Sequence, residues 1–155
     1  MVDIASGYFD TALEKRDKVI GQALKVLKHR SNDYDVIVCR GYSGMTIAPI
    51  LAWALKKPIF IVRKDGESTH SSEKSFMGTL GDRYLMIDDF VSTGETIRTI
   101  RDYLTIAHDR AELPEGKIVG LYLYESYDDD GVYENIPTWG TDHVHYRKRK
   151  QCVAA

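Results

Sequence analysis

The sequence YLMIDDFVSTGETI, residues 84–97, decides both the predicted fold and the predicted site. It begins as an apolar run that is typical of a buried strand, and it then places Asp88 and Asp89 side by side. Hydroxyl side chains around Gly94 follow, and a helical pattern starts directly after them. Because burying two adjacent carboxylates is costly, their place at the end of an apolar strand indicates a role other than packing.

Similar strands alternate with helices along the chain. Apolar runs predict strands at residues 35–39, 58–62, 85–87 and 117–124, and helical patterns occur at residues 10–30, 45–56 and 95–106. Thr11 and Glu14 have capping-box spacing in the first helix, and Pro49 is expected early in the second, where proline is tolerated. Strands that are apolar on both faces and alternate with helices predict an α/β fold with one mostly parallel, twisted sheet flanked by helices.

Two long segments lack such a pattern. Residues 63–78 are polar and aperiodic, which predicts a long loop of the kind that serves as a lid or a binding loop. Residues 125–155 are turn-rich, with a short strand expected at residues 143–146.

Length and composition indicate one globular domain. The 155 residues suffice for a sizeable core, and the formal net charge of −2 gives no bulk field that would recruit nucleic acid. Two cysteines, Cys39 and Cys152, with no apolar leader and no membrane-length apolar run, favour a cytoplasmic protein with reduced thiols. The basic run at residues 147–150 is interpreted as a solvated tail, with a polyanion contact as the alternative.

The turn at residues 92–96 has the composition of a phosphate-binding loop. Its glycine lets a ligand approach the backbone, the amides of a first helical turn favour an anion, and hydroxyl side chains add donors. Asp88 and Asp89 would repel that phosphate, but they can accept hydrogen bonds from ribose hydroxyls or hold a hydrated Mg²⁺. A ribose 5-phosphate fits both the acid pair and the turn at residues 92–96. The structural alternative is that Asp88 ends the strand and Ser92 or Thr93 caps the helix.

Residues 84–97 resemble the phosphoribosyl pyrophosphate signature of the type I phosphoribosyltransferases, in which an apolar strand and two acids precede Thr-Gly-x-Thr. The order of helices and strands over residues 33–124 is also similar to the core of that family. The resemblance implies the type I fold within a single domain, residues 1–155. It also implies a small hood over the site, built here from residues 1–32 and 125–155.

The resemblance implies a ribose site beside a phosphate site. Asp88 and Asp89 would bind the ribose hydroxyls, directly or through Mg²⁺, and they are the predicted metal ligands. The 5-phosphate would be wrapped mostly by backbone amides of Ser92, Thr93, Gly94, Glu95 and Thr96. Glu95 stands where many relatives have glycine, so its side chain must point away from the phosphate.

A second turn with exposed amides follows the strand at residues 35–39. It corresponds to the pyrophosphate loop of the family, so Arg40 and Gly41 are predicted to bind substrate, with bidentate hydrogen bonds from Arg40 to the pyrophosphate. The resemblance also implies a cis peptide bond between Cys39 and Arg40. Without the resemblance, this turn is an ordinary strand–helix junction with an exposed arginine.

The polar loop supplies the remaining candidates. Arg63 and Lys64 resemble the Arg-Lys pair that opens the mobile loop of the orotate and adenine branches, where such cations would offset the charge of the leaving pyrophosphate. His70 and Lys74 are predicted tip residues of this loop, and a plain exposed histidine is the alternative for His70.

The implied activity is Mg²⁺-dependent transfer of the 5-phosphoribosyl group from phosphoribosyl pyrophosphate to a nucleobase, by a homodimer in nucleotide metabolism and nucleoside salvage. Ser92 replaces the aspartate that the 6-oxopurine branch commonly carries before its Thr-Gly, which favours an orotate-like or adenine-like acceptor. Aromatic candidates for stacking on the base are Tyr8, Phe9, Tyr127, Tyr133 and Trp139, with packing as the alternative.

Two other classes of protein stay open. A relative that senses phosphoribosyl pyrophosphate without catalysis, and that regulates transcription or binds RNA, would use the basic run at residues 147–150. A generic nucleotide-binding α/β domain is disfavoured by the completeness of the signature. The intact acids and the loop cations favour the enzyme.

Overall fold

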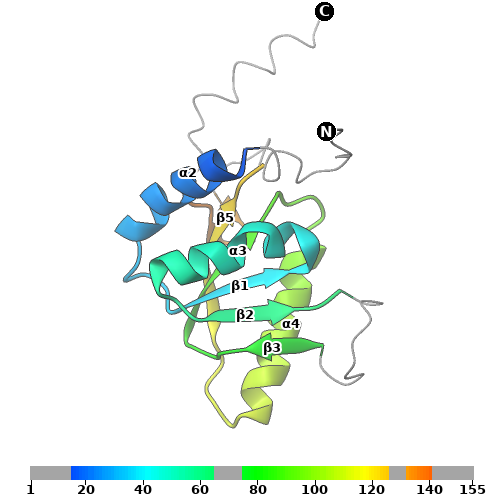
Figure 1. Ribbon diagram of the computed structural model, residues 1–155. Coiled ribbons are helices and arrows are strands. Elements are labelled where there is room, and N and C mark those ends of the chain that lie inside the picture. Colours follow the sequence, from blue (N-terminus) through cyan, green and yellow to red (C-terminus); the bar gives the residue numbers. More distant parts are fainter. Residues whose placement is uncertain (1–14, 65–74, 126–131, 141–155) are drawn as a thin grey trace, which may run out of the picture.

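The computed structural model describes residues 15–64, 75–125 and 132–140, and it has a central five-stranded sheet (Figure 1). The strands are β1 (Val36–Arg40), β2 (Ile59–Val62), β3 (Phe76–Gly78), β4 (Arg83–Asp88) and β5 (Lys117–Leu123), in the order β3-β2-β1-β4-β5. β2, β1, β4 and β5 run parallel, and β3 is antiparallel to β2. The predicted mostly parallel sheet is confirmed.

Helices cover both faces of this sheet (Figure 1). They are α2 (Arg16–His29), α3 (Gly41–Leu55) and α4 (Glu95–Arg110). Ile37 and Leu85 point to the face covered by α2 and α3, and Val38 and Met86 point to the face covered by α4. The strands are therefore buried on both sides, as their apolar runs predict.

A small hairpin lies beside β5. It consists of β6 (Val132–Tyr133) and β7 (Ile136–Pro137), joined by a turn in which Glu134 and Asn135 have φ angles of 47° and 66°. Two positive φ angles are typical of the two-residue hairpin turn whose twist matches the strands. The N–H of Trp139 donates to the carbonyl of Leu121 at 2.7 Å, which ties the hairpin to β5.

Trp139 belongs to the core. Its side chain is 5% exposed and its ring lies 6.0 Å from the ring of Tyr34, measured between centroids. For Trp139 the alternative of packing is therefore correct, and an exposed base-stacking role is wrong.

The structure corrects the predicted start of α3. The helix begins at Gly41 rather than at Met45, so Pro49 lies in its middle and not in its first turn. At that place the missing N–H leaves the carbonyl of Met45 without its helical hydrogen bond. The predicted helix start at Thr11 lies outside the described residues.

Two short elements were not predicted. Residues 76–78 of the expected long loop form β3, where the ring of Phe76 stacks on that of Phe60 at 5.6 Å. The hairpin β6–β7 lies in the segment predicted only as turn-rich, and the strand expected at residues 143–146 lies outside the described residues. In the described ranges no helix is both long and apolar enough to cross a membrane.

Candidate functional site

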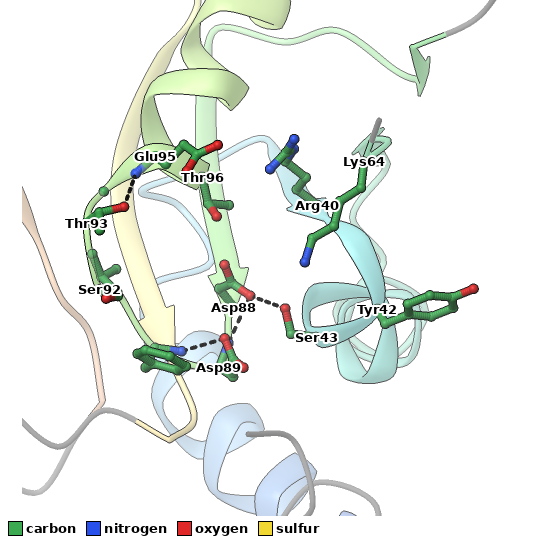
Figure 2. Close-up of a pocket in the computed structure, with 13 residues that line it drawn as sticks. Arg40, Tyr42, Ser43, Lys64, Asp88, Asp89, Ser92, Thr93, Glu95 and Thr96 are labelled. Atoms are coloured by element: carbon green, nitrogen blue, oxygen red, sulfur yellow. Dashed lines mark hydrogen bonds between the residues drawn. The ribbon is translucent and has the colours of Figure 1, made fainter. Parts of the chain in front are cut away.

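The carboxyl ends of three parallel strands meet at a pocket of about 570 Å³ (Figure 2). Three segments line it: Arg40, Tyr42 and Ser43 at the end of β1, Lys64 after β2, and residues 88–96 at the end of β4. The structure thus brings together nine of the predicted residues, namely Arg40, Lys64, Asp88, Asp89, Ser92, Thr93, Gly94, Glu95 and Thr96. The expected convergence at one edge of the sheet holds for all three strand ends.

Two other predicted site residues that the structure describes, Gly41 and Arg63, do not line the pocket. Gly41 is buried directly beneath Lys64, and Arg63, at the end of β2, does not line the pocket. His70 and Lys74 lie outside the described residues, as do the aromatic candidates Tyr8, Phe9 and Tyr127.

The two acids are buried and held in place by hydrogen bonds. Asp88 is 4% exposed and Asp89 is 7% exposed. Oδ1 of Asp88 accepts from the Ser43 hydroxyl at 2.5 Å and from the Asp89 N–H at 3.0 Å, and Oδ1 of Asp89 accepts from the Phe90 N–H at 2.8 Å (Figure 2). The segment that follows β4 is therefore ordered at the pocket floor.

The backbone directly after β5 extends this support. The Tyr124 N–H donates to the carbonyl of Asp88 at 3.2 Å, and the Glu125 N–H donates to the carbonyl of Asp89 at 2.7 Å. The Tyr124 hydroxyl in turn donates to the Ser43 carbonyl at 2.7 Å. One buried tyrosine thus joins the turn after β1 to the end of β5.

Burial sets the electrostatics of the acids. Burial is the main cause that raises the pKa of Asp88 to about 7; the Ser43 hydrogen bond opposes this rise and the neighbouring charge of Asp89 adds to it. Among the described residues neither acid forms a salt bridge. The pair therefore favours a ligand that brings hydroxyl donors or a cation.

The acids fit Mg²⁺ that is shared with a ligand. In the described part of the chain no group of three or more His, Cys, Asp or Glu side chains could hold a metal ion by itself. Mg²⁺ usually keeps several waters and binds through one or two carboxylates together with substrate phosphates. Asp88 and Asp89, which line the pocket, are two carboxylates that would fit this mode of binding.

The turn after β1 depends on a missing side chain. Arg40 is extended, with φ −137° and ψ 135°, and Gly41 then takes a φ of 64° as the first residue of α3. A Cβ on Gly41 would collide with Cε of Lys64, whose stem lies across the glycine and whose ammonium reaches into the pocket (Figure 2). No cis peptide occurs among the described residues, so the implied cis bond between Cys39 and Arg40 is wrong. The left-handed conformation of Gly41 makes the turn instead.

Arg40 is a buried cation with an unused donor. The residue is 9% exposed, and its Nε has no hydrogen-bond partner within the described structure. A buried donor without a partner is costly, and a phosphate-type anion would satisfy it. The expectation of an exposed arginine at an ordinary junction is wrong.

The loop after β4 presents backbone to the pocket. Gly94, with a φ of 72°, is the N-cap of α4, and no side chain caps the helix there. The Thr93 hydroxyl accepts only a long hydrogen bond, 3.4 Å, from the Glu95 N–H. No side chain therefore caps α4 at Gly94 as the structural alternative expected, and residues 92–96 line the pocket. The Glu95 side chain is exposed at the rim.

Sequence reasoning gave no individual role to Tyr42 and Ser43. The Ser43 hydroxyl contacts an acid that lies 45 positions away, which no local pattern reveals. The Tyr42 side chain is 73% exposed and its ring points away from the acids (Figure 2).

Comparison with known proteins gives a family and two groups of relatives. The family model described as phosphoribosyl transferase domain matches residues 10–109. The hypoxanthine/guanine phosphoribosyltransferase of Methanopyrus kandleri is 35% identical over 80 residues, 43% of this chain and 43% of that protein. The orotate phosphoribosyltransferase of Thermus thermophilus is 28% identical over 104 residues, 67% of this chain and 52% of that protein. The chain therefore spans about half the length of the curated relatives it matches.

Solved structures show a likeness of fold. The orotate phosphoribosyltransferase from Aeropyrum pernix has a TM-score of 0.59 at 15% identity, over 89% of this chain and 77% of that one. The adenine phosphoribosyltransferase from Saccharomyces cerevisiae has a TM-score of 0.51 at 18% identity, over 86% of this chain and 72% of that one. At these identities the likeness concerns the architecture, which agrees with the predicted type I fold.

Proposed function

The chain belongs to the phosphoribosyl transferase family, and we propose that it transfers the 5-phosphoribosyl group from phosphoribosyl pyrophosphate to a nucleobase. Pyrophosphate is the second product. The observation that carries the proposal is the pairing of two kinds of group in one pocket: buried acids beside an amide-rich loop, and opposite them a buried arginine with an unused donor.

The substrate matches this distribution of charge. The 5-phosphate would lie on the loop at residues 92–96, where backbone amides and hydroxyls are donors. The ribose hydroxyls would donate to Asp88 and Asp89, and the pyrophosphate would lie against Arg40 and Lys64. Each part of the substrate thus meets groups of the opposite hydrogen-bonding character.

The chemical step is displacement at the anomeric carbon. A ring nitrogen of the base forms the new C–N bond while the C–O bond to pyrophosphate breaks, and the bonding electron pair leaves with the pyrophosphate. Arg40 and Lys64 would stabilise the charge that develops on the leaving oxygen, and the acids would hold the ribose in line for attack. No nucleophile from the protein is required.

We propose Mg²⁺ as the cofactor, held by Asp88 and Asp89 together with the substrate. A bound Mg²⁺ supplies charge neutralisation between ribose hydroxyls and pyrophosphate oxygens. Arg63, His70 and Lys74 are proposed to assist from the segment that follows β2.

We propose orotate or a purine as the acceptor. Ser92 stands in place of the aspartate of the 6-oxopurine branch, which favours an orotate-like or adenine-like base. The relatives named above include a hypoxanthine/guanine enzyme, so guanine and hypoxanthine belong in the same test.

The test is release of pyrophosphate from phosphoribosyl pyrophosphate and Mg²⁺ with a panel of orotate, adenine, hypoxanthine, guanine and uracil. We expect release with one class of base and none without base. Binding of phosphoribosyl pyrophosphate without release for any base would contradict the enzyme and favour a sensor. A lack of binding would contradict both.

We also propose a cytoplasmic homodimer, and one surface favours the dimer. α3 carries no charged side chain over its 15 residues, yet Tyr42 is 73% and Trp53 is 83% exposed on it, with Met45 and Ile50 between them. The two rings expose roughly 350 Å². Two copies would bury roughly 700 Å² from these rings alone, a little under half of a standard interface.

An uncharged helix face can pack on its own copy without repulsion, which is why the proposed partner is a second chain. Light scattering of the wild type should give the mass of a dimer, and Trp53→Glu should give the mass of a monomer. A monomeric wild type would contradict this proposal.

A further inference from the structure

We infer that Arg98, held by Glu134 of the β6–β7 turn, is a positioning residue that aims the Gly94 amide at the bound phosphate. The inference rests on the proposed function of the pocket. The residues that it concerns are far apart in the sequence, and neither Arg98 nor Glu134 lines the pocket.

Arg98 holds a carbonyl of the phosphate loop from outside the pocket. Nη2 of Arg98 donates to the Thr93 carbonyl at 2.8 Å, and Arg98 itself does not line the pocket. In a planar trans peptide the carbonyl and the following N–H point in opposite directions. Because the Thr93 carbonyl is drawn outward to Arg98, the Gly94 N–H is turned toward the pocket side.

Glu134 holds the arginine. Nη1 of Arg98 donates to Oε1 of Glu134 at 3.0 Å, and Nη1 of Arg101 donates to Oε2 of the same carboxylate at 2.6 Å. The three side chains are 53%, 29% and 42% exposed for Arg98, Glu134 and Arg101. An isolated pair at this exposure contributes little to stability, so the value of the contact lies in fixing the direction of Arg98.

The same hairpin covers the back of the loop at Gly94. A Cβ on Gly94 would collide with the Tyr133 ring and its hydroxyl, and the φ of 72° disfavours any other residue. The loop is therefore enclosed between the pocket on one side and residues 133–134 on the other. Support of this kind presents the amide in its binding direction before the ligand arrives, which lowers the cost of ordering the loop.

The phosphate end of the substrate does not change during the reaction. A group that binds it equally before and during the chemical step affects KM and leaves kcat unchanged. Loss of the Arg98 contact should therefore weaken binding of the phosphorylated ribose without slowing turnover at saturation.

The test compares Arg98→Met with Arg101→Met. Each variant removes a cation of α4 that pairs with Glu134. Only Arg98 also contacts the Thr93 carbonyl. Calorimetry would measure the Kd of ribose 5-phosphate, and kinetics would measure KM and kcat for phosphoribosyl pyrophosphate. We expect Arg98→Met to raise Kd and KM about 10-fold with kcat within about 2-fold of wild type, and Arg101→Met to stay within about 2-fold in all three.

Glu134→Gln provides a second line of evidence, since Glu134 is argued to act through Arg98. In the wild-type background it should raise the Kd of ribose 5-phosphate about 3-fold, and in the Arg98→Met background it should add nothing. Thermal unfolding of all variants checks that the fold is retained.

Two results would overturn the inference while leaving the proposed function intact: equal Kd values for Arg98→Met and wild type, or a fall in kcat with KM unchanged. If the wild type binds neither ribose 5-phosphate nor phosphoribosyl pyrophosphate, the proposed function fails and the inference fails with it.

Discussion

Two strand-to-helix turns build the pocket, and each is held in place by a different kind of support. After β1 the chain passes directly from Arg40 into α3, and the turn is supported from inside the pocket by the stem of Lys64 lying on Gly41. After β4 a loop separates Asp88 from α4, and this loop is supported from outside by Arg98 and Tyr133.

The difference follows from what each turn presents. Arg40 at the end of β1 and Lys64, which lies on Gly41, are cations, and cations on long side chains can reach a ligand and pack their stems on the backbone at once. The loop after β4 presents acids and backbone amides, which are short and have no stems to spare, so other elements must hold them. Changes to the two turns should therefore fail in different ways.

The largest effect is expected for the acids. Asp88→Asn combined with Asp89→Asn removes both carboxylates that would bind ribose and Mg²⁺, and kcat/KM for phosphoribosyl pyrophosphate should fall by about 10³-fold. Circular dichroism should show a retained fold, because the asparagine oxygens can still accept the present hydrogen bonds. Full activity in this double variant would contradict the ribose role.

The turn after β1 should be sensitive to one methyl group. Gly41→Ala strains a left-handed residue and displaces Lys64, so we expect about 1–2 kcal/mol lower unfolding free energy and about 10-fold lower kcat/KM. Gly21→Ala in α2 is the matched control, since no atom lies within 4 Å of its added methyl. That control should be neutral or stabilising by up to about 1 kcal/mol. Unchanged activity in Gly41→Ala would show that Lys64 does not depend on this glycine.

Asp88 should lower the stability of the folded protein at high pH, although the proposed function requires it. Its pKa in the folded state is raised from 3.8 to about 7, so the native state keeps a proton that the unfolded state has released. The wild type therefore loses stability as the pH rises through this window. Asp88→Asn lacks this loss and should be more stable by about 1–2 kcal/mol at pH 8, with no gain at pH 4.

The control variant, Asp35→Asn, should change the stability in the opposite direction. The hydrogen bond from Arg83 lowers the pKa of Asp35, so this carboxylate stabilises the fold above its ordinary pKa. Asp35→Asn should destabilise the protein at pH 8 and have less effect as the pH falls below about 4. Urea unfolding at several pH values measures both variants, and a loss of stability for Asp88→Asn at pH 8 would refute the burial argument.

The smallest effect is expected at the rim of the loop after β4. Glu95→Gln removes an exposed negative charge beside the proposed phosphate, so KM for phosphoribosyl pyrophosphate should fall about 2-fold at low salt and less at high salt. Asp102→Asn, an exposed position further along α4, should leave KM unchanged. A rise in KM for Glu95→Gln would mean that this acid contributes to binding.

Local pattern was enough to predict the strands and the acids. β1, β4 and β5 are apolar on both faces, and Asp88 and Asp89 end one of them. The start of α3 was predicted too late, at Met45 and not at Gly41, because Gly41 and Gly44 have low helix propensity. Packing overrides it: a Cβ on Gly44 would lie 2.7 Å from Cβ of Cys39, so the glycine lets α3 begin directly on the strand end.

Contacts that depend on tertiary proximity were out of reach. The bond from Ser43 to Asp88 spans 45 positions and the bond from Tyr124 to Ser43 spans 81. The β6–β7 turn was missed because Glu134 and Asn135 take positive φ angles without the glycine that usually announces such a turn.

The position of the β6–β7 hairpin has a consequence for the order of synthesis. The loop at residues 92–96 leaves the ribosome before β5, and its support at residues 133–134 follows only after β5. A chain that ends before residue 132 holds both acids, Arg40 and Lys64, yet it lacks Tyr133 and Glu134. During translation the sheet can therefore form before the loop at residues 92–96 has its support, and the proposed phosphate site would be complete only once residues 133–134 have been added.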